Sequence, residues 1–297
     1  MGTEPYTNST SYSGNIIVST VATDPATGPG LVTMFNSRGA LVSLMRDLYS
    51  SSEWATGTAF LSPYTIVSSI QGTVRLELTD IRTNSYTSIA NANLTSAPIR
   101  QIAVDSAQSI WIVEAAAAQQ DIEKFTVSGQ RVGNPFIPTT VGSCVLATPW
   151  GIAYMPNLNY IAVISSAVAG KLDVYDTNGN CINQVVAAPL NAGTPTGVAY
   201  HSTSGMLLVT FATSHAIWAM NFDGTGATQI YLNSAIINTP KAIATDAQGN
   251  IYVGSNGTNT VEKIYWSGSG AATRVLSGPF IGPGAYSQHP TSITVIP

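Results

Sequence analysis

Six residues with side chains suited to ligand binding stand at the same place in a stretch that recurs along the chain: Thr56, Arg100, Trp150, Thr196, Lys241 and Thr291. The set holds two cations, one indole and three hydroxyls. An indole face can stack on a ligand, and guanidinium and ammonium groups donate charge-assisted hydrogen bonds to acidic groups. If the six converge, they predict a site for an acidic or sugar-like group. The alternative is that they are ordinary polar surface.

Two further residues join this set of candidates. Trp54 stands with Trp150 at the starts of recurring stretches, and these are the two of five tryptophans expected to meet a ligand. His215 lies in a polar loop that is expected on the same side. We therefore predict ligand contacts for both of these residues.

No catalytic residue is assigned from the sequence. The three histidines are His201, His215 and His289, and no G-x-S-x-G or similar elbow accompanies them. A Ser–His–Asp set needs an oriented base and a buried acid, and the pattern provides neither. Asp105 and Asp246 fall in tight turns, where they are expected to bond the turn backbone.

The recurring stretch is clearest at residues 239–255, "TPKAIATDAQGNIYVGS". It returns at 194–210 and 148–164, more faintly at 97–113 and 53–69. The prolines that mark it are 51, 46, 45 and 50 residues apart, and they are Pro98, Pro149, Pro195, Pro240 and Pro290. A period near 46 residues suits the four-stranded blade of a β-propeller.

Each copy predicts four short strands joined by turns rich in Gly, Asn and Asp, which tolerate positive φ. Complete copies are expected at about 53–94, 97–140, 148–190, 194–236 and 239–280. The tail "HPTSITVIP" has the pattern of a first strand, and the N-terminal part begins at the second. The two ends together predict a sixth blade that closes the ring. Residues 114–125 look helical but fall between the second and third strands of their copy, where we expect a long loop.

The pattern P-x-[GA]-[IV]-A-x-D…G-N-I-Y-V…I-x-x-[FY]…G resembles the NHL-repeat class of six-bladed β-propellers, best at 239–266. The resemblance implies an all-β, six-bladed propeller with four-stranded antiparallel blades. It also implies that the long loops and strand starts share one face, at the mouth of the central channel. It implies no single function, since related propellers serve as enzymes, binders and scaffolds.

The calcium-dependent lactonases are a neighbouring propeller family that resembles this chain less well. Glu53 stands at a plausible first position of their metal site. However, Trp150 occupies a place where Asn is wanted as a hard oxygen ligand for Ca²⁺. We expect no metal and no other cofactor, and we count Glu53 among the residues of the channel face. A lactonase-like hydrolase with a cation in the channel remains the alternative to a non-catalytic binding or scaffold protein.

The composition of the 297 residues is 44% hydrophobic and only 9% charged, against roughly 25% charged in typical soluble domains. A net charge of −4 provides no basic surface for nucleic acid, and no apolar run reaches the length of a membrane span. The Ser/Thr/Asn-rich surface predicts an exported protein, secreted, periplasmic or at the cell surface. We expect a monomer that binds carbohydrate, peptide, protein or cell-envelope material at the channel face. Residues 1–13 are expected to be a disordered polar leader and 14–297 a single domain. Cys144 and Cys181 form either one disulfide or two unpaired thiols.

Overall fold

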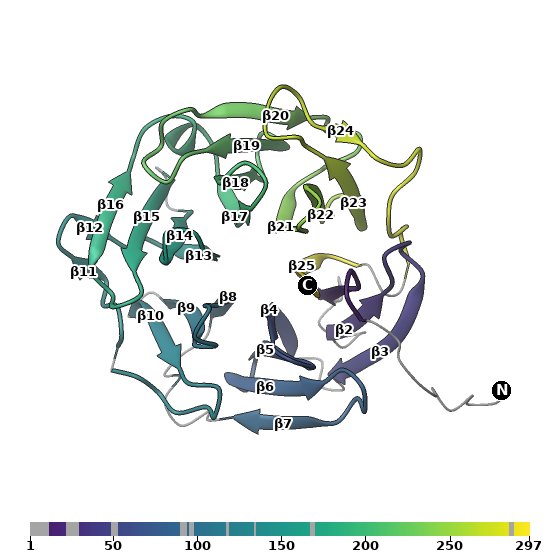
Figure 1. The fold of residues 1–297 in the computed structure, drawn as a ribbon, viewed down its shortest axis with the longest axis horizontal. Coiled ribbons are helices and arrows are strands. Elements are labelled where there is room, and N and C mark those ends of the chain that lie inside the picture. Colours follow the sequence, from purple (N-terminus) through teal and green to yellow (C-terminus); the bar gives the residue numbers. More distant parts are fainter. Residues whose placement is uncertain are drawn as a thin grey trace.

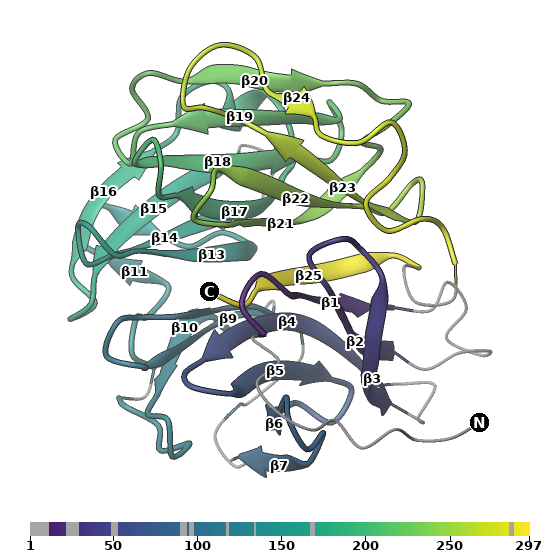
Figure 2. The ribbon, with the colours of Figure 1, turned by 45° about the vertical axis from the view of Figure 1, so that its right-hand side comes forward.

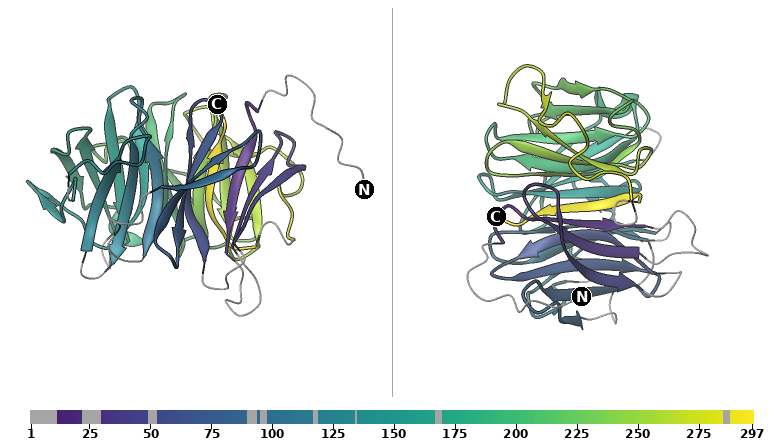
Figure 3. Two further views of the ribbon diagram at one scale, coloured as in Figure 1. Left: turned by 90° about the horizontal axis from the view of Figure 1, so that it is seen from below. Right: turned by 90° about the vertical axis from the view of Figure 1, so that its right-hand side faces the viewer.

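The computed structural model describes residues 12–21, 30–48, 53–89, 94, 98–116, 119–133, 135–166, 170–284 and 288–297. Apart from one short two-stranded sheet, its strands form six antiparallel sheets arranged around a common axis (Figure 1). The side views in Figure 3 show the strands crossing the disc from one face to the other. The prediction of an all-β, six-bladed propeller is confirmed.

Four blades follow the predicted order of four consecutive strands, from the channel outwards. They are β4(Trp54–Leu61), β5(Thr65–Gln71), β6(Arg75–Asp80) and β7(Tyr86–Ile89); β13(Pro149–Met155), β14(Tyr160–Ser165), β15(Lys171–Asp176) and β16(Cys181–Val185); β17(Pro195–His201), β18(Met206–Phe211), β19(Ala216–Met220) and β20(Thr228–Leu232); and β21(Pro240–Thr245), β22(Asn250–Ser255), β23(Thr260–Tyr265) and β24(Thr273–Arg274).

Another blade differs in its outer edge. It holds β8(Ile99–Val104), β9(Ile110–Ala116) and β10(Gln119–Phe125), and isolated bridges from Arg131 and Ile137 cover β10. The short pair β11(Thr140–Val141) and β12(Cys144–Val145) follows. A 3₁₀ helix over Leu190–Ala192 is the only helical element among the described residues.

The prediction of a long loop within residues 114–125 is wrong. Strand β9 continues to Ala116 and β10 begins at Gln119, and Gln119 pairs directly with Ala116. Only residues 117–118, which lie outside the described residues, separate the two strands. The Ala- and Glu-rich composition of this segment disfavours a strand, but such local propensity is weak and strand pairing in the blade overrides it.

The sixth blade joins both ends of the chain, as predicted. It holds β1(Ile16–Thr20), β2(Gly30–Phe35) and β3(Leu41–Leu48), with β25(Pro290–Val295) at the channel. Figure 2 shows β25 lying beside β1. The register pairs Ile16 with Val295 and Val18 with Ile293. Most of the predicted leader lies outside the described residues, so the boundary at residue 13 stays a prediction.

One hydrophobic cluster fills each of the six gaps between neighbouring blades. Strand β9 shows the reason. Its side chains alternate across the sheet, so Trp111 and Val113 pack toward one neighbouring blade while Ile110 and Ile112 pack toward the other. Strands buried on both faces need apolar residues at consecutive positions, which accounts for the high hydrophobic content at low charge.

The two cysteines form a disulfide, which settles the alternative left open by the sequence. Cys144 of β12 is joined to Cys181 of β16, 37 residues later. The bond ties the segment that enters this blade to its outermost strand. No helix among the described residues is long and apolar enough to cross a membrane.

Candidate functional site

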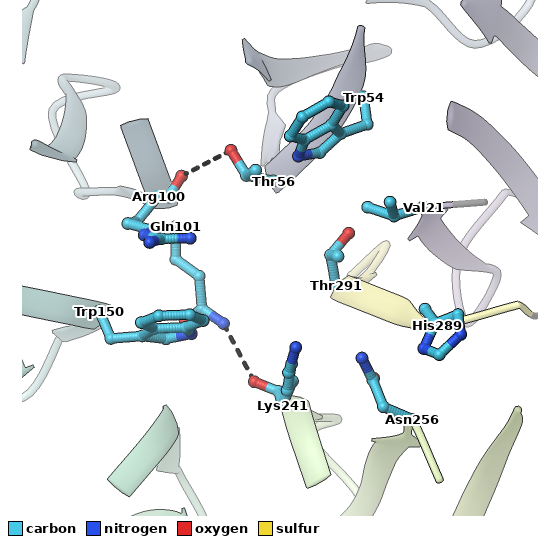
Figure 4. A pocket seen from close by; sticks show the side chains of 10 residues that line it. All are labelled: Val21, Trp54, Thr56, Arg100, Gln101, Trp150, Lys241, Asn256, His289 and Thr291. Carbon is cyan, nitrogen blue, oxygen red and sulfur yellow. Dashed lines mark hydrogen bonds between the residues drawn. The ribbon is translucent and has the colours of Figure 1, made fainter. Parts of the chain in front are cut away.

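A cavity of about 310 Å³ opens at one mouth of the channel (Figure 4). Its walls come from the starts of the first strands, the end of one second strand and residues beside them. The lining residues are Val21, Trp54, Thr56, Arg100, Gln101, Trp150, Lys241, Asn256, His289 and Thr291.

A β-bulge at the start of the first strands presents six of these ten residues. In β21 the pairing passes from Pro240 directly to Ala242, so Lys241 has no partner in the ladder. The skipped residues of the other blades are Thr56, Trp150, Thr196 and Thr291, and in β8 both Arg100 and Gln101 are skipped. A bulge redirects a side chain out of the regular alternation. The six predicted positions are therefore the six bulges of the ring.

The three threonines of this ring bond to neighbouring blades. The Thr56 hydroxyl donates to the carbonyl of Ile99 at 2.9 Å, Thr291 to that of Ala55 at 2.8 Å, and Thr196 to that of Pro240 at 2.6 Å. Each bond links the first strands of two adjacent blades. Thr56 and Thr291 line the cavity, whereas Thr196 is not among its lining residues. These hydroxyls hold the ring together at the level of the cavity.

Among the described residues, no carboxylate is paired with Arg100. Its guanidinium carbon lies 3.9 Å from the centre of the Trp150 ring, and its Nε is buried without a hydrogen-bond partner. Burial lowers the pKa of Arg100, although a guanidinium stays charged at neutral pH. A desolvated charge is costly unless it is paired. The indole stack offsets part of that cost and leaves the guanidinium available to an anion.

The Lys241 ammonium adds to the positive potential of the cavity, and His289 lies in the same wall. Burial lowers the pKa of Lys241, and the charge of Arg100 lowers it further. Burial, followed by the charge of Lys241, lowers the pKa of His289. In Figure 4 the Lys241 side chain points into the cavity between Trp150 and Asn256. No acidic residue is among the residues described as lining the cavity.

Gln101 reaches across the channel. Its Nε2 donates to the Lys241 carbonyl at 3.4 Å, from a blade on the opposite side of the ring (Figure 4). The equivalent position in the other blades is small: Gly57, Gly151, Gly197, Ala242 and Ser292. A Cβ at Gly151 would come within 3.1 Å of the Gln101 amide oxygen. The small residues leave the room that this one long side chain occupies.

A second hollow, of about 420 Å³, begins below Gln101. It is lined from Ile102 onwards in β8 and from the matching Ile152 and Ile243 in β13 and β21. Its walls are mostly apolar and continue to the turns of the opposite face. Gln101 thus lies between the polar cavity and this apolar hollow.

Asn256 follows β22 and is only 6% exposed. Its amide oxygen is buried without a partner, and its side chain points into the cavity (Figure 4). Although Asn256 begins an Asn-Gly-Thr sequon, the folded chain buries this amide. An unsatisfied buried amide is costly, and a ligand with a hydroxyl or amine would satisfy it.

The sequence predicts ligand contacts for two residues outside the bulges of the ring, Trp54 and His215, and places Glu53 on the same face. Together with Arg100, Trp150 and Lys241 these make six candidate site residues. Four of them line the cavity: Trp54, Arg100, Trp150 and Lys241. The other two have different neighbours. Glu53 pairs with Arg75 at 2.6 Å, and this pairing lowers the pKa of the Glu53 carboxyl. His215 accepts a hydrogen bond from the Thr239 amide at its Nδ1, at 3.0 Å. A role of any of the six in binding stays a prediction.

Sequence reasoning missed Gln101 and Asn256, and it left His289 without a role. Gln101 could have been recognised from the sequence, since the other copies of the repeat have Gly, Ala or Ser at its position. Asn256 could not, because Asn after a second strand is also common in exposed loops. The structure places His289 in the cavity wall.

The described residues bring three acidic side chains together at one place, away from the cavity. Glu114, Asp121 and Glu123 are buried with oxygen atoms within 4.8 Å of one another. Glu123 is paired with Arg131, and burial raises the pKa of Asp121 to about 6. The three carboxyls therefore meet one guanidinium, and burial shifts Asp121 toward its protonated form. Asp105 and Asp246 bond turn amides, as predicted.

Neither a comparison with protein-family models nor one with curated proteins finds a match. Solved structures do match. A chain of a nidogen/laminin complex has a TM-score of 0.71 at 16% identity, covering 95% of this chain and 98% of that one. Virginiamycin B lyase from Staphylococcus aureus has a TM-score of 0.55 at 14% identity, covering 75% and 70%. A streptogramin B lyase has a TM-score of 0.56 at 15% identity, covering 75% and 69%.

At these identities the likeness concerns the fold alone. The matched structures include a chain from a protein–protein complex and two lyases, so they indicate no single activity. The resemblance to NHL-type propellers is confirmed at that level. The chain therefore shares a β-propeller fold with these structures, and its own ring has six blades.

Proposed function

We propose that this chain is a non-catalytic binding protein that takes a carboxylate-bearing ligand in the channel-mouth cavity. The observation that carries the proposal is the pair of partly buried cations, Arg100 and Lys241, without a carboxylate among the described lining residues. Buried charges in proteins are normally paired, so the missing partner is supplied by the ligand.

Acidic carbohydrate is the ligand class that fits the remaining walls. Two indoles, those of Trp54 and Trp150, provide apolar surface, and Asn256 provides an amide for a hydroxyl. A volume of about 310 Å³ is at the small end of ligand pockets and suits one sugar ring rather than a long chain. The disulfide and the composition support an exported protein that meets such ligands outside the cytosol.

The alternative of a lactonase-type hydrolase needs several hard oxygen ligands around a cation in the channel. The described walls present cations, indoles and amides at that place. Glu53, which the sequence suggested as a first ligand, is engaged by Arg75. The donor set therefore favours anion binding.

Glucuronate should bind and glucose should not. The two sugars differ in one carboxylate, so calorimetric titration with each measures the contribution of the anion alone. We expect a dissociation constant on the order of 1 mM or tighter for glucuronate, and binding at least ~10-fold weaker for glucose. Equal affinities would contradict the proposal. Binding of a dipeptide through its terminal carboxylate, with no binding of glucuronate, would assign the cavity to peptides instead.

Affinity for the anion should fall as pH rises. In the free protein, burial and a neighbouring cation hold the pKa values of His289 and Lys241 below their ordinary ranges. A bound carboxylate raises both pKa values, so binding takes up protons wherever either group is neutral beforehand. Titrations between about pH 5 and pH 9, in buffers of different ionisation enthalpy, measure this uptake. Affinity that is independent of pH would remove both groups from the site.

A further inference from the structure

Lys241 differs from the other three lysines of the chain in the surroundings of its amine. Lys124 donates to the Thr177 carbonyl at 2.9 Å, and Lys171 donates to the Val145 carbonyl at 2.7 Å. Lys263 lies over the Tyr252 ring, 5.1 Å from its centre. Among the described residues, Lys241 Nζ has no such partner, and it projects into a ligand-sized cavity.

The same surroundings favour the neutral amine. Burial is the first cause, and the unpaired charge of Arg100 in the same wall is the second. A desolvated lysine beside another cation is a better nucleophile, because a lowered pKa raises the fraction of the amine whose lone pair is free of a proton at a given pH. The other polar groups of the wall, Asn256 and His289, donate and accept hydrogen bonds without adding a negative charge.

We propose that Lys241 forms a reversible imine with the aldehyde or ketone carbon of an oxo acid whose carboxylate is held by Arg100. The proposal rests on the anion site described above and narrows its ligand to acids that carry a free carbonyl. A free hexuronic acid in its open form belongs to this class. The contact is covalent binding, with no turnover implied.

The step balances within the cavity. The Lys241 nitrogen attacks the carbonyl carbon, and the electron pair of the C=O bond moves to oxygen, which gains a proton as the nitrogen loses one. The hydroxyl of the resulting carbinolamine then accepts a proton and leaves as water, while the nitrogen lone pair forms the C=N bond and the nitrogen gives up its remaining proton. His289 lines the same cavity, and its lowered pKa leaves the imidazole neutral and able to carry the proton from nitrogen to oxygen.

Reductive trapping tests the proposal. The protein is incubated with glyoxylate and sodium cyanoborohydride at neutral pH, and the adducts are assigned by mass spectrometry of peptides. We expect Lys241 to be modified at least ~10-fold faster than the other three lysines, and Lys241→Arg to lose this modification. Lys263→Arg is the matched control and keeps it. Labelling of all four lysines at similar rates, or no labelling of Lys241, would overturn the proposal.

Acetaldehyde and acetate separate this inference from the anion site beneath it. Acetaldehyde has a carbonyl but lacks the carboxylate. Arg100→Met should therefore slow the trapping of glyoxylate at Lys241 and leave the trapping of acetaldehyde unchanged. For the same reason, acetate should compete with glyoxylate and not with acetaldehyde. Binding of acetate without any trapping would leave the anion site intact and refute the imine. Equal trapping of both carbonyl compounds, indifferent to acetate, would refute recognition of an oxo acid by Arg100.

Discussion

Replacing Arg100 by methionine should weaken carboxylate binding by ~10- to 100-fold and leave the protein at least as stable as before. The loss of affinity follows from removing a charge-assisted hydrogen bond, which contributes ~1.5–3 kcal/mol. The effect on stability has the opposite sign because, in the part of the chain that the structure describes, no carboxylate is paired with the guanidinium. Its Nε is buried without a partner, and its described contact is the Trp150 ring.

Methionine keeps most of that contact. Its thioether packs on an aromatic ring with ~0.3–1.5 kcal/mol, comparable to an exposed cation–π pair. The substitution removes the desolvation free energy that the charged guanidinium costs in the partly buried cavity wall. We expect the free energy of unfolding to rise by about 1 kcal/mol, or roughly 2–4 °C in the melting midpoint.

Arg131→Met is the matched control, since it makes the same change in the same blade. Arg131 is paired with Glu123, whose side chain is fully buried. Removing its partner leaves an uncompensated carboxylate, at a cost of roughly 3–5 kcal/mol. Arg131→Met should therefore lower the stability and leave the affinity unchanged, because Arg131 is not among the residues that line the cavity. Arg100→Met should lower the affinity without lowering the stability. A destabilised Arg100→Met protein with unchanged affinity would make Arg100 a structural residue.

The positions around the channel could be predicted from the sequence because they belong to the repeat. Once the recurring stretch is aligned, Trp150 and Lys241 must occupy equivalent places in the ring, whatever lies between them. The bulge that turns them toward the cavity is part of each copy, so one register serves all six blades. The closure by β25 followed from the same alignment.

Features that differ between blades could not be predicted in this way. Arg75, in the third strand, forms an ion pair with Glu53, and the pattern of the repeat does not predict such a pair. The orientation of His215 depends on the neighbouring Thr239 amide in the next blade. Gln101 crosses the ring only because residues of other blades are small. Contacts between blades depend on side-chain geometry, which the spacing of the repeat does not contain.

Deleting residues 289–297 should abolish cooperative folding. The deletion removes β25, the channel strand of the sixth blade, and with it the whole ladder to β1. Ile293 is 6% exposed and belongs to the hydrophobic cluster that fills one gap of the ring. The Thr294 hydroxyl donates to the Thr58 carbonyl at 2.7 Å, which links the sixth blade to the next one.

In a ring that one strand pairing closes, loss of the closing strand exposes surfaces on both sides of the gap. Without β25, both β1 and β21 lose the surface that covers them, and the edge of β1 is left with unpaired backbone groups. We expect the shortened protein to show no sharp thermal transition, or to aggregate at concentrations where the full chain stays in solution. The control removes only Pro297, which is exposed and lies beyond β25, and should melt like the full chain. A protein that lacks all nine residues and still melts at the same midpoint would show that the contacts between the other blades hold the ring without closure.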